Sequence, residues 1–353
     1  MTNHKIFSVC LILAVFQAKS ALSCTTFAMP QSKEKIVGKS FDWHLGHGFA
    51  MVNKRGVSKK ALALNSEDNP AEWVSKFGSV TFNVLGRDLP MGGVNEAGLV
   101  VEIMNNEEEL TPLEDRPTVN ELQWIQYQLD RYSSVKEVVE NVKALSISKV
   151  MADVHYMACD AQGECATLEF TSNQSVVHWG DSMPKKVLTN DPYEDLLKYY
   201  EKTSGQSDSF DDSGSEDRFV KAARMSQQYD PQKESPTAAE YAFKILDEVK
   251  QGSYTKWNIV YDLKNKVIQF RTRLVPKIRT LQMSSLDFSC RTPVLVLDLN
   301  QKFEGDVTNQ LSPYTPAVNE RLSELSEEFE RLAMSPEQIK LLRDFPETTA
   351  CVN

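Results

Sequence analysis

Cys24 combines two groups that together can cleave an amide, provided that the chain begins at this residue. A terminal cysteine carries a thiol, with an ordinary pKa of about 8.5, and an α-amine, with one of about 7.7–8.0. Near neutral pH the amine can accept the thiol proton during attack on a carbonyl and later pass it to the leaving nitrogen. Whether the chain is cleaved before Cys24 therefore decides this hypothesis.

Residues 1–23 are typical of a secretory signal peptide. The apolar run from Ile6 to Phe16 is too short to span a bilayer, which takes roughly 20 residues. Ala21 and Ser23 place small residues at positions −3 and −1 before Cys24, as signal peptidase requires. The pattern predicts an exported protein, periplasmic or secreted, in which residues 24–353 form one domain.

A lipoprotein is the alternative interpretation of this segment, because a lipidated cysteine also follows its signal sequence directly. Bulky Leu22 at position −2 and Ala21 at −3 favour ordinary signal peptidase instead. The distinction matters for function, since an acylated Cys24 has no free thiol.

The charge of the chain excludes some partners. The net charge of −10 becomes −12 when Lys5 and Lys19 leave with residues 1–23. An acidic protein of this kind is not expected to bind nucleic acid or an anionic membrane surface, and no later segment is apolar for long enough to insert in a bilayer. A small molecule is the expected partner.

Five cysteines remain after cleavage, so at least one of them has no partner for a disulfide within the chain. Cys159 and Cys165 flank a short polar turn that could bring them into bonding range, and Cys290 and Cys351 could tie down the tail. Cys24 is then a candidate reactive thiol, with an unpaired structural cysteine as the alternative.

The histidines offer two further hypotheses. His44 and His47 could suggest a metal site, but no third ligand is in view. A Cys–His dyad with His155 or His178 is the other alternative. We expect neither a metal nor another cofactor, because the α-amine supplies the base.

The first motifs after the proposed cleavage site resemble those of the choloylglycine hydrolases, which comprise conjugated bile-acid hydrolases and penicillin V acylases. Cys-Thr-Thr-Phe from Cys24 is similar to the family's mature start, where the terminal cysteine is the nucleophile. Gly-Lys-Ser-Phe-Asp at residues 38–42 falls where the family has Gly-Arg-Asn-Leu-Asp. The resemblance implies that Asp42 holds the α-amine and that Lys39 takes the place of an arginine beside the thiol.

Three more motifs follow in the family's order. Gly-Val-Asn-Glu-Ala-Gly-Leu at residues 93–99 is similar to Gly-Met-Asn-Glu-Lys-Gly-Leu, and an active-site position ten residues after that asparagine corresponds to Asn105. Leu-Thr-Asn-Asp-Pro at residues 188–192 resembles Leu-Thr-Asn-Asn-Pro, which places an oxyanion donor at Asn190. Ser-Glu-Asp-Arg-Phe-Val-Lys-Ala at residues 215–222 carries the family's second arginine to Arg218. Each motif alone is weak, but five in order are a strong indication.

Two departures from the family limit what is carried over. Lys39 replaces a planar guanidinium by a flexible point charge. The stretch between Asn190 and Arg218 is shorter than in the bile-acid hydrolases, where it carries an arm that locks tetramers together. A homo-oligomer is therefore left open, and a tetramer is not inferred.

The resemblance implies hydrolysis of a linear C–N amide through an acyl-thioester on Cys24. The expected substrate joins an apolar acyl group to a small polar amine, as in conjugated bile acids, phenoxyacetyl-type penicillins and N-acyl homoserine lactones. The alternatives are a non-catalytic homologue that binds lipid-like amides and a lipoprotein anchored through Cys24. Residues 46–60 and 64–77 are expected to form loops that set specificity.

The elements that must position these residues come in blocks. Strands are predicted at residues 25–29, 36–41, 80–85, 99–104, 151–159, 166–170, 175–179, 256–261, 267–273 and 294–298. Helices are predicted at residues 117–132, 134–145, 192–200, 216–228, 236–250, 318–334 and 335–342. Blocks of strands interrupted by blocks of helices, without βαβ alternation, indicate an α+β fold with mainly antiparallel sheets. The resemblance implies its form, a four-layer αββα sandwich of the N-terminal nucleophile hydrolase type.

Overall fold

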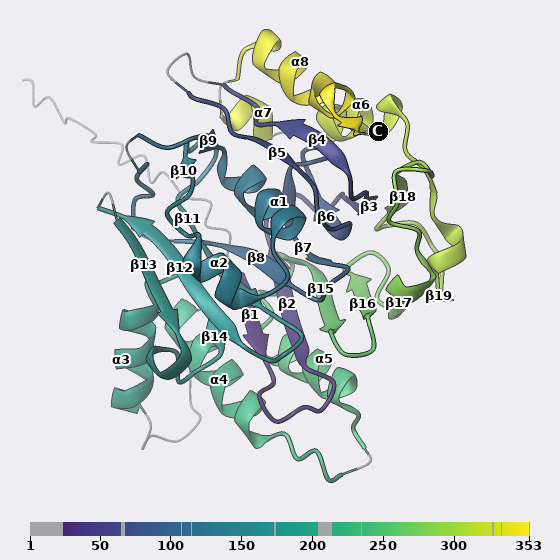
Figure 1. The fold of residues 1–353 in the computed structure, drawn as a ribbon. Coiled ribbons are helices and arrows are strands. Elements are labelled where there is room, and N and C mark those ends of the chain that lie inside the picture. The colour runs from purple at the N-terminus through teal and green to yellow at the C-terminus, as the bar shows by residue number, and fades with distance from the viewer. Residues whose placement is uncertain are drawn as a thin grey trace, which may run out of the picture.

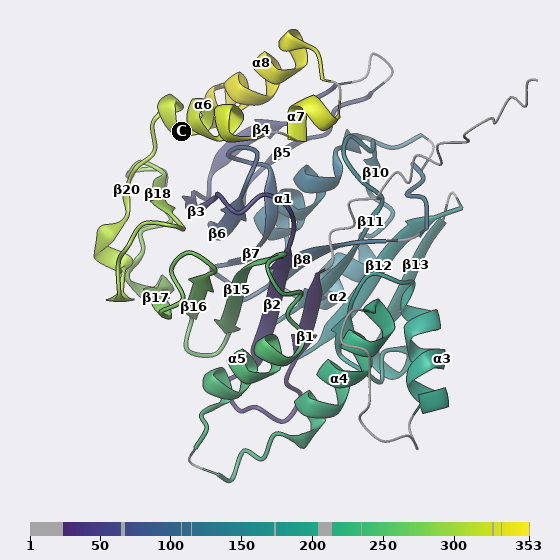
Figure 2. The ribbon, with the colours of Figure 1, turned by 180° about the vertical axis from the view of Figure 1, so that it is seen from behind.

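Two large β-sheets lie face to face, and helices cover the outer face of each (Figures 1 and 2). The computed structural model describes residues 24–64, 68–106, 108–113, 115–172, 174–203, 214–233, 235–326, 328–332 and 334–352. The layers follow the order helices, sheet, sheet, helices. The predicted α+β sandwich of four layers is confirmed.

The first sheet has seven strands in the order β14-β1-β2-β15-β16-β17-β19 and is antiparallel except at the β17–β19 pair. Its strands are β1 (Thr25–Ala28), β2 (Ile36–Asp42), β14 (Val187–Leu188), β15 (Thr255–Asp262), β16 (Val267–Thr272), β17 (Arg279–Gln282) and β19 (Gly305–Asp306). The predicted hairpin of residues 25–29 and 36–41 is β1–β2, in which Thr25 lies opposite Ser40. All seven residues of β2 are buried, because both faces of this strand are covered.

The second sheet has nine strands in the order β13-β12-β11-β8-β7-β6-β3-β18-β20, all antiparallel. Its strands are β3 (Phe49–Asn53), β6 (Ser79–Asn83), β7 (Pro90–Asn95), β8 (Val100–Asn105), β11 (Val154–Cys159), β12 (Cys165–Thr171), β13 (Gln174–Trp179), β18 (Leu295–Asp298) and β20 (Ser312–Pro313). Two small sheets complete the described strands, one of β9 (Thr118–Val119) and β10 (Ser146–Ile147), the other of β4 (Val57–Lys60), β5 (Glu72–Val74) and β21 (Ala350–Cys351).

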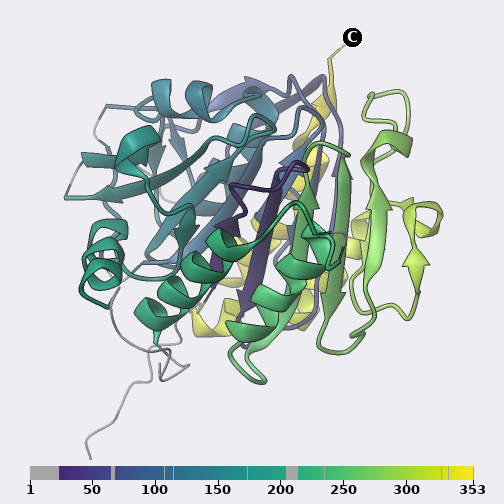
Figure 3. The ribbon, with the colours of Figure 1, turned by 90° about the horizontal axis from the view of Figure 1, so that it is seen from below.

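Helices cover each sheet from one side. Against the seven-stranded sheet lie α4 (Ser215–Gln228) and α5 (Ala238–Glu248), with α3 (Tyr193–Thr203) packed on α4; Figure 3 shows the green α4 and α5 in front of the purple strands β1 and β2. Against the nine-stranded sheet lie α1 (Glu121–Arg131) and α2 (Val135–Glu140). The C-terminal α6 (Pro316–Leu325), α7 (Glu328–Arg331) and α8 (Pro336–Asp344) lie near β4 and β5. Among the described helices, none is long and apolar enough to cross a membrane.

The space between the sheets is filled mainly by large apolar side chains. The ring of Phe82, from the nine-stranded sheet, lies 6.3 Å from that of Tyr261 and 6.0 Å from that of Phe270, both from the seven-stranded sheet. Two charged side chains, Lys39 and Glu102, are also enclosed there. Such charges are costly to bury unless they have partners, so their contacts require an explanation.

Both predicted disulfides are present. Cys159 and Cys165 lie opposite each other in β11 and β12 and are bonded. Cys290 is bonded to Cys351, which belongs to the C-terminal strand β21. Disulfides persist in oxidising compartments, so these bonds indicate such a compartment. Cys24 is the free cysteine of the described residues.

Several expected elements were wrong in extent. The segment 46–60, expected as a loop, contains β3 and β4, and 64–77 contains β5. The helix predicted from residue 117 begins at Glu121, because the side chain of Asn120 accepts from the N–H groups of Leu122 and Gln123. The helix predicted over 134–145 ends at Glu140.

The single helix predicted over residues 318–334 is two helices, α6 and α7. Ser326 has an extended backbone and ends α6. The exposed loop predicted at 202–214 lies mostly outside the described residues, as does the predicted signal peptide.

Candidate active site

The β1–β2 hairpin brings Cys24 and Asp42 together. Cys24 immediately precedes β1, and Asp42 is the last residue of β2. Because Thr25 lies opposite Ser40 in this antiparallel pair, the start of β1 and the end of β2 meet at one edge of the sheet. The backbone N–H of Asp42 donates to the sulfur of Cys24. A local hairpin is therefore enough to place a carboxylate beside the thiol.

Asp42 is fully buried and has one oxygen to spare. Its Oδ1 accepts hydrogen bonds from the hydroxyl of Ser40, at 2.8 Å, and from that of Thr255 on β15. Its Oδ2 is buried and makes no hydrogen bond within the described part of the chain. Burial raises the pKa of Asp42 to about 6, although the bond from Thr255 and the charge of Arg218 act in the opposite direction. A nearby cation with a hydrogen to donate would satisfy Oδ2.

Arg218 connects Cys24 to Asn190. One guanidinium nitrogen of this buried side chain donates to the carbonyl oxygen of Cys24 and to the hydroxyl of Thr25, and another donates to Oδ1 of Asn190; all three distances are 2.8 Å. Arg218 lies in the first turn of α4, and Ser215, which begins that helix, accepts the backbone N–H of Asn190 at 2.8 Å. The start of α4 therefore fixes both the position and the rotation of the Asn190 side chain.

Asn190 and Asn105 meet across the two sheets. The Nδ2 group of Asn190 donates to the carbonyl oxygen of Asn105 at 3.1 Å. Asn105 lies opposite Val154 of β11, and the next residue, Asn106, donates to the carbonyl oxygen of Asp153. Asn106 and Asp153 therefore form a hydrogen-bonded pair of the antiparallel ladder, and the adjacent pair, Asn105 with Val154, is a non-hydrogen-bonded one. The N–H of Asn105 is therefore not used by the β8–β11 ladder.

Lys39 reaches the same neighbourhood from inside the sandwich. It lies on β2 opposite Thr26, and its ammonium donates to the carbonyl oxygen of Ile103 and to the sulfur of Met104. The side chain of Lys39 is 1% exposed, so its charge acts through a protein interior rather than through water.

Burial and the charges around Cys24 have opposing effects on the pKa of its thiol. Burial raises the pKa of the Cys24 thiol, and the charge of Asp42 adds to this effect. The charges of Lys39 and Arg218 lower it. The thiol is therefore the resting form at neutral pH, and a base must take its proton before it can attack.

The histidines are arranged for other contacts. The ring nitrogens of His155 lie 3.2 Å from Oε1 of Glu169 and 2.8 Å from the carbonyl oxygen of Thr189. The ring of His178 lies 4.9 Å from that of Tyr193. This placement does not support a dyad of Cys24 with His155. Within the described ranges, no three histidine, cysteine or acidic side chains are grouped to bind a metal.

The structure brings together all six residues predicted from the sequence: Cys24, Lys39, Asp42, Asn105, Asn190 and Arg218. Their catalytic roles stay predictions. Three neighbours were not anticipated as site residues. Ser215 lies in a motif that was recognised, whereas Thr255 and Glu102 carry no local sequence pattern that could have identified them.

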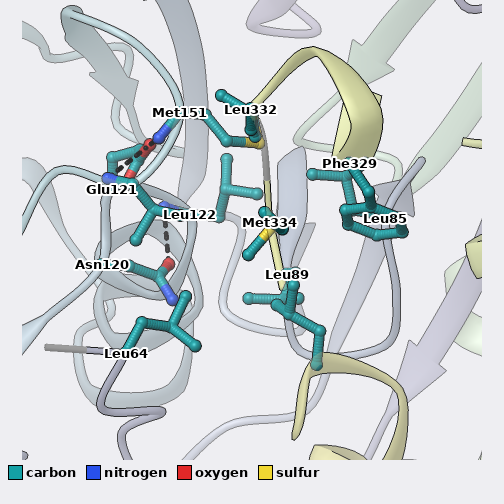
Figure 4. A pocket seen from close by; sticks show the side chains of 12 residues that line it. Leu64, Leu85, Leu89, Asn120, Glu121, Leu122, Met151, Phe329, Leu332 and Met334 are labelled. Atoms are coloured by element: carbon teal, nitrogen blue, oxygen red, sulfur yellow. Dashed lines mark hydrogen bonds between the residues drawn. The ribbon is translucent and has the colours of Figure 1, made fainter. Parts of the chain in front are cut away.

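An apolar pocket lies at the same end of the nine-stranded sheet as Asn105. Its cavity volume is about 20 Å³, and Figure 4 shows Leu89 and Met151 among its walls together with Phe329 and Leu332 from the C-terminal segment. Met151 lies three residues before Val154, the partner of Asn105 in β11. The lining does not include Cys24, so the pocket and Cys24 are separate features.

The two polar residues of this pocket, Asn120 and Glu121, already have hydrogen-bond partners. The carboxylate of Glu121 accepts the backbone N–H groups of Val150, Met151 and Ala152. Its bonds are therefore directed to the main chain, as the dashed line to Met151 in Figure 4 illustrates. The small space that remains is lined mainly by apolar side chains.

Two relatives resemble this chain over most of their length. Penicillin V acylase from Pectobacterium atrosepticum is 25% identical over 363 residues, which span 87% of this chain and 94% of the relative. The solved structure of penicillin V acylase from Agrobacterium tumefaciens superposes with a TM-score of 0.73 at 25% identity, covering 83% of this chain and 98% of that one.

A third likeness concerns the fold alone. The structure of a variant of conjugated bile acid hydrolase from Clostridium perfringens superposes with a TM-score of 0.64 at 16% identity, over 80% of this chain and 98% of that one. The fold is thus that of the N-terminal nucleophile hydrolases. The family model of the linear amide C–N hydrolases, choloylglycine hydrolase family, matches residues 24–296, from Cys24 into β18. The chain therefore belongs to the choloylglycine hydrolase family.

Proposed function

We propose that this protein, once cleaved before Cys24, hydrolyses linear amides that join an apolar acyl group to a small polar amine. The observation that carries the proposal is the convergence of Asp42, Arg218 and Asn190 on Cys24. Membership of a family of linear amide C–N hydrolases supports the reaction type. The likeness to two penicillin V acylases supports this substrate class.

Cleavage would supply the missing base. In the full-length chain the nitrogen of Cys24 belongs to a peptide bond, and cleavage before it would create a free α-amine. The amine takes the thiol proton as the sulfur attacks the substrate carbonyl. The resulting ammonium would pair with Oδ2 of Asp42, the buried oxygen that has no hydrogen bond within the described residues.

The attack creates an oxyanion that needs hydrogen-bond donors. We assign these donors to the side-chain amide of Asn190, which lies 3.1 Å from the carbonyl oxygen of Asn105, and to the N–H of Asn105, which lies outside the β8–β11 ladder. One well-placed donor of this kind contributes roughly 3–4 kcal/mol. As the C–N bond breaks, the ammonium gives its proton to the leaving amine, which leaves an acyl-thioester on Cys24. Water then attacks the thioester with the α-amine as base, and this releases the acid and restores the thiol.

The test is amide turnover by the purified, exported protein. The panel contains glycine- and taurine-conjugated bile acids, a phenoxyacetyl-type penicillin and N-acyl homoserine lactones, and the assay measures release of free amine. Acid quench followed by intact mass should trap an acyl group on Cys24. Cys24→Ser should fold but react far more slowly, because a hydroxyl is much harder to ionise than a thiol.

The controls separate the alternatives. Turnover that survives in Cys24→Ala would end the proposal. The N-terminal mass must show a bare Cys24, whereas a diacylglycerol adduct would indicate the lipoprotein. A bare Cys24 without turnover on the whole panel would favour the non-catalytic homologue that binds lipid-like amides.

A further inference from the structure

Lys39 has an ionic partner on the opposite sheet. Its ammonium lies 3.9 Å from Oε2 of Glu102 on β8, and the two side chains are 1% and 2% exposed. Lys39 belongs to the seven-stranded sheet and Glu102 to the nine-stranded sheet, so the pair joins the two halves of the sandwich. A buried charge with a single distant partner is costly, and the surroundings of Glu102 show how this one is accommodated.

Tyr261 and Gly92 hold the carboxylate of Glu102 in place. The hydroxyl of Tyr261, from β15, donates to Oε1 of Glu102 at 2.6 Å. Gly92 lies opposite Glu102 in the β7–β8 pair, and a Cβ atom on it would lie 2.0 Å from Oε2 of Glu102. Such a contact is impossible without displacing the carboxylate. Glycine at this position therefore makes the space that the carboxylate occupies.

The ammonium of Lys39 thus faces two groups that can become anionic, Glu102 and Cys24. Its charge lowers the pKa of both. Burial nevertheless raises the pKa of Glu102 to about 7, with the bond from Tyr261 acting in the opposite direction. The titratable groups that face Glu102 are Lys39 from β2 and Tyr261 from β15; β7 presents Gly92, and β11 places Met157 opposite.

We propose that Glu102 is a positioning residue that holds the Lys39 ammonium between the sheets and limits how strongly its charge favours the Cys24 thiolate. This inference rests on the proposed role of Cys24 as nucleophile. It also accounts for a lysine at a place where the family has an arginine. A flexible ammonium needs an external restraint, and Glu102, Tyr261 and Gly92 provide one.

The test is the pH dependence of Cys24 alkylation in the processed protein. Glu102→Gln keeps the shape of the side chain and removes its charge, so the Lys39 charge that lowers the thiol pKa is no longer offset and the alkylation midpoint should fall by up to about one pH unit. Tyr261→Phe should shift the midpoint in the same direction by less, because loss of that bond makes Glu102 easier to protonate. Asp130→Asn, at a buried carboxylate of α1 that pairs with Lys59, is the matched control and should leave the midpoint unchanged.

A double-variant cycle shows whether Glu102 acts through Lys39. In Lys39→Met the ammonium through which Glu102 acts is gone, so adding Glu102→Gln should shift the midpoint little. Equal shifts in both backgrounds, or no shift in Glu102→Gln and Tyr261→Phe, would overturn the inference. These outcomes are independent of amide turnover, whereas the proposed function fails if turnover survives in Cys24→Ala.

Discussion

Arg218→Lys tests whether the arginine orients Asn190 or only supplies charge. The guanidinium makes three hydrogen bonds of 2.8 Å, to the carbonyl oxygen of Cys24, the hydroxyl of Thr25 and Oδ1 of Asn190. A lysine ammonium is a single point donor and cannot reproduce this fork. Loss of one charge-assisted bond, the one to Asn190, costs about 2 kcal/mol. If that bond aligns the oxyanion donor, kcat should fall ~30-fold, since 1.36 kcal/mol is a factor of ten.

Two comparisons make this prediction specific. Asn190→Ala removes the donor itself and should lower kcat by roughly 100-fold or more. The double variant should be little slower than Asn190→Ala alone, because both changes act on one amide. The alkylation midpoint of Cys24 should be unchanged in Arg218→Lys and raised in Arg218→Met, since only the second removes a charge that lowers the thiol pKa. Unchanged kcat in Arg218→Lys, or a double variant as slow as the product of the two effects, would refute the reasoning.

Four further predictions concern the same cluster. Because the pKa of Asp42 is raised to about 6, its carboxylate becomes protonated as pH falls through that value. The value of kcat/KM should decline over the same range, and at lower pH once an ammonium lies beside Asp42. A pH–rate profile of Asp42→Asn that kept this acid limb would contradict the assignment. Lys39→Met should raise the alkylation midpoint of Cys24, and Lys39→Arg should preserve or improve turnover; an unchanged midpoint in Lys39→Met would place Lys39 outside the site. The native exported protein should show one titratable thiol. This thiol should be absent in Cys24→Ala, whose circular dichroism spectrum should be unchanged. Three or more titratable thiols would refute the disulfide pairing. Gly92→Ala should lower the free energy of unfolding, measured by urea denaturation, by about 1–3 kcal/mol. The loss caused by Gly92→Ala should be smaller in a protein that already carries Glu102→Ala. Equal losses in the two backgrounds would argue against a close approach of the Glu102 carboxylate to Gly92.

The parts of the site that could be predicted from sequence are those set by local structure. The hairpin of residues 25–42 carries Cys24 and Asp42 on adjacent strands, so a correct hairpin prediction already places them together. The Cys159–Cys165 bond was predictable for the same reason, because a short turn separates its two strands. The motif resemblance then added Asn190 and Arg218, which no local pattern would have joined.

The rest depends on pairings between distant segments. Thr255 bonds to Asp42 because β15 lies beside β2, a contact across 213 residues. Tyr261 reaches Glu102 across 159 residues, from the same strand β15. Strand β4, expected as loop, pairs with the nearby β5 on one side and with β21, at the end of the chain, on the other. Apolar periodicity describes which face of an element is buried, but it does not say which element covers that face.

The Cys290–Cys351 bond makes the C-terminal segment a covalent ring. Residues 291–350 lie within it, including Phe329 and Leu332 of the pocket wall, and most of the ring lies beyond the range matched by the family model. Closing a loop with a sequence separation of 61 residues removes chain entropy from the unfolded state worth about 4 kcal/mol. Cys24 and its hairpin lie outside the ring. Reducing agents should therefore loosen the pocket wall formed by Phe329 and Leu332, whereas the hairpin that carries Cys24 and Asp42 keeps the contacts that hold it in place.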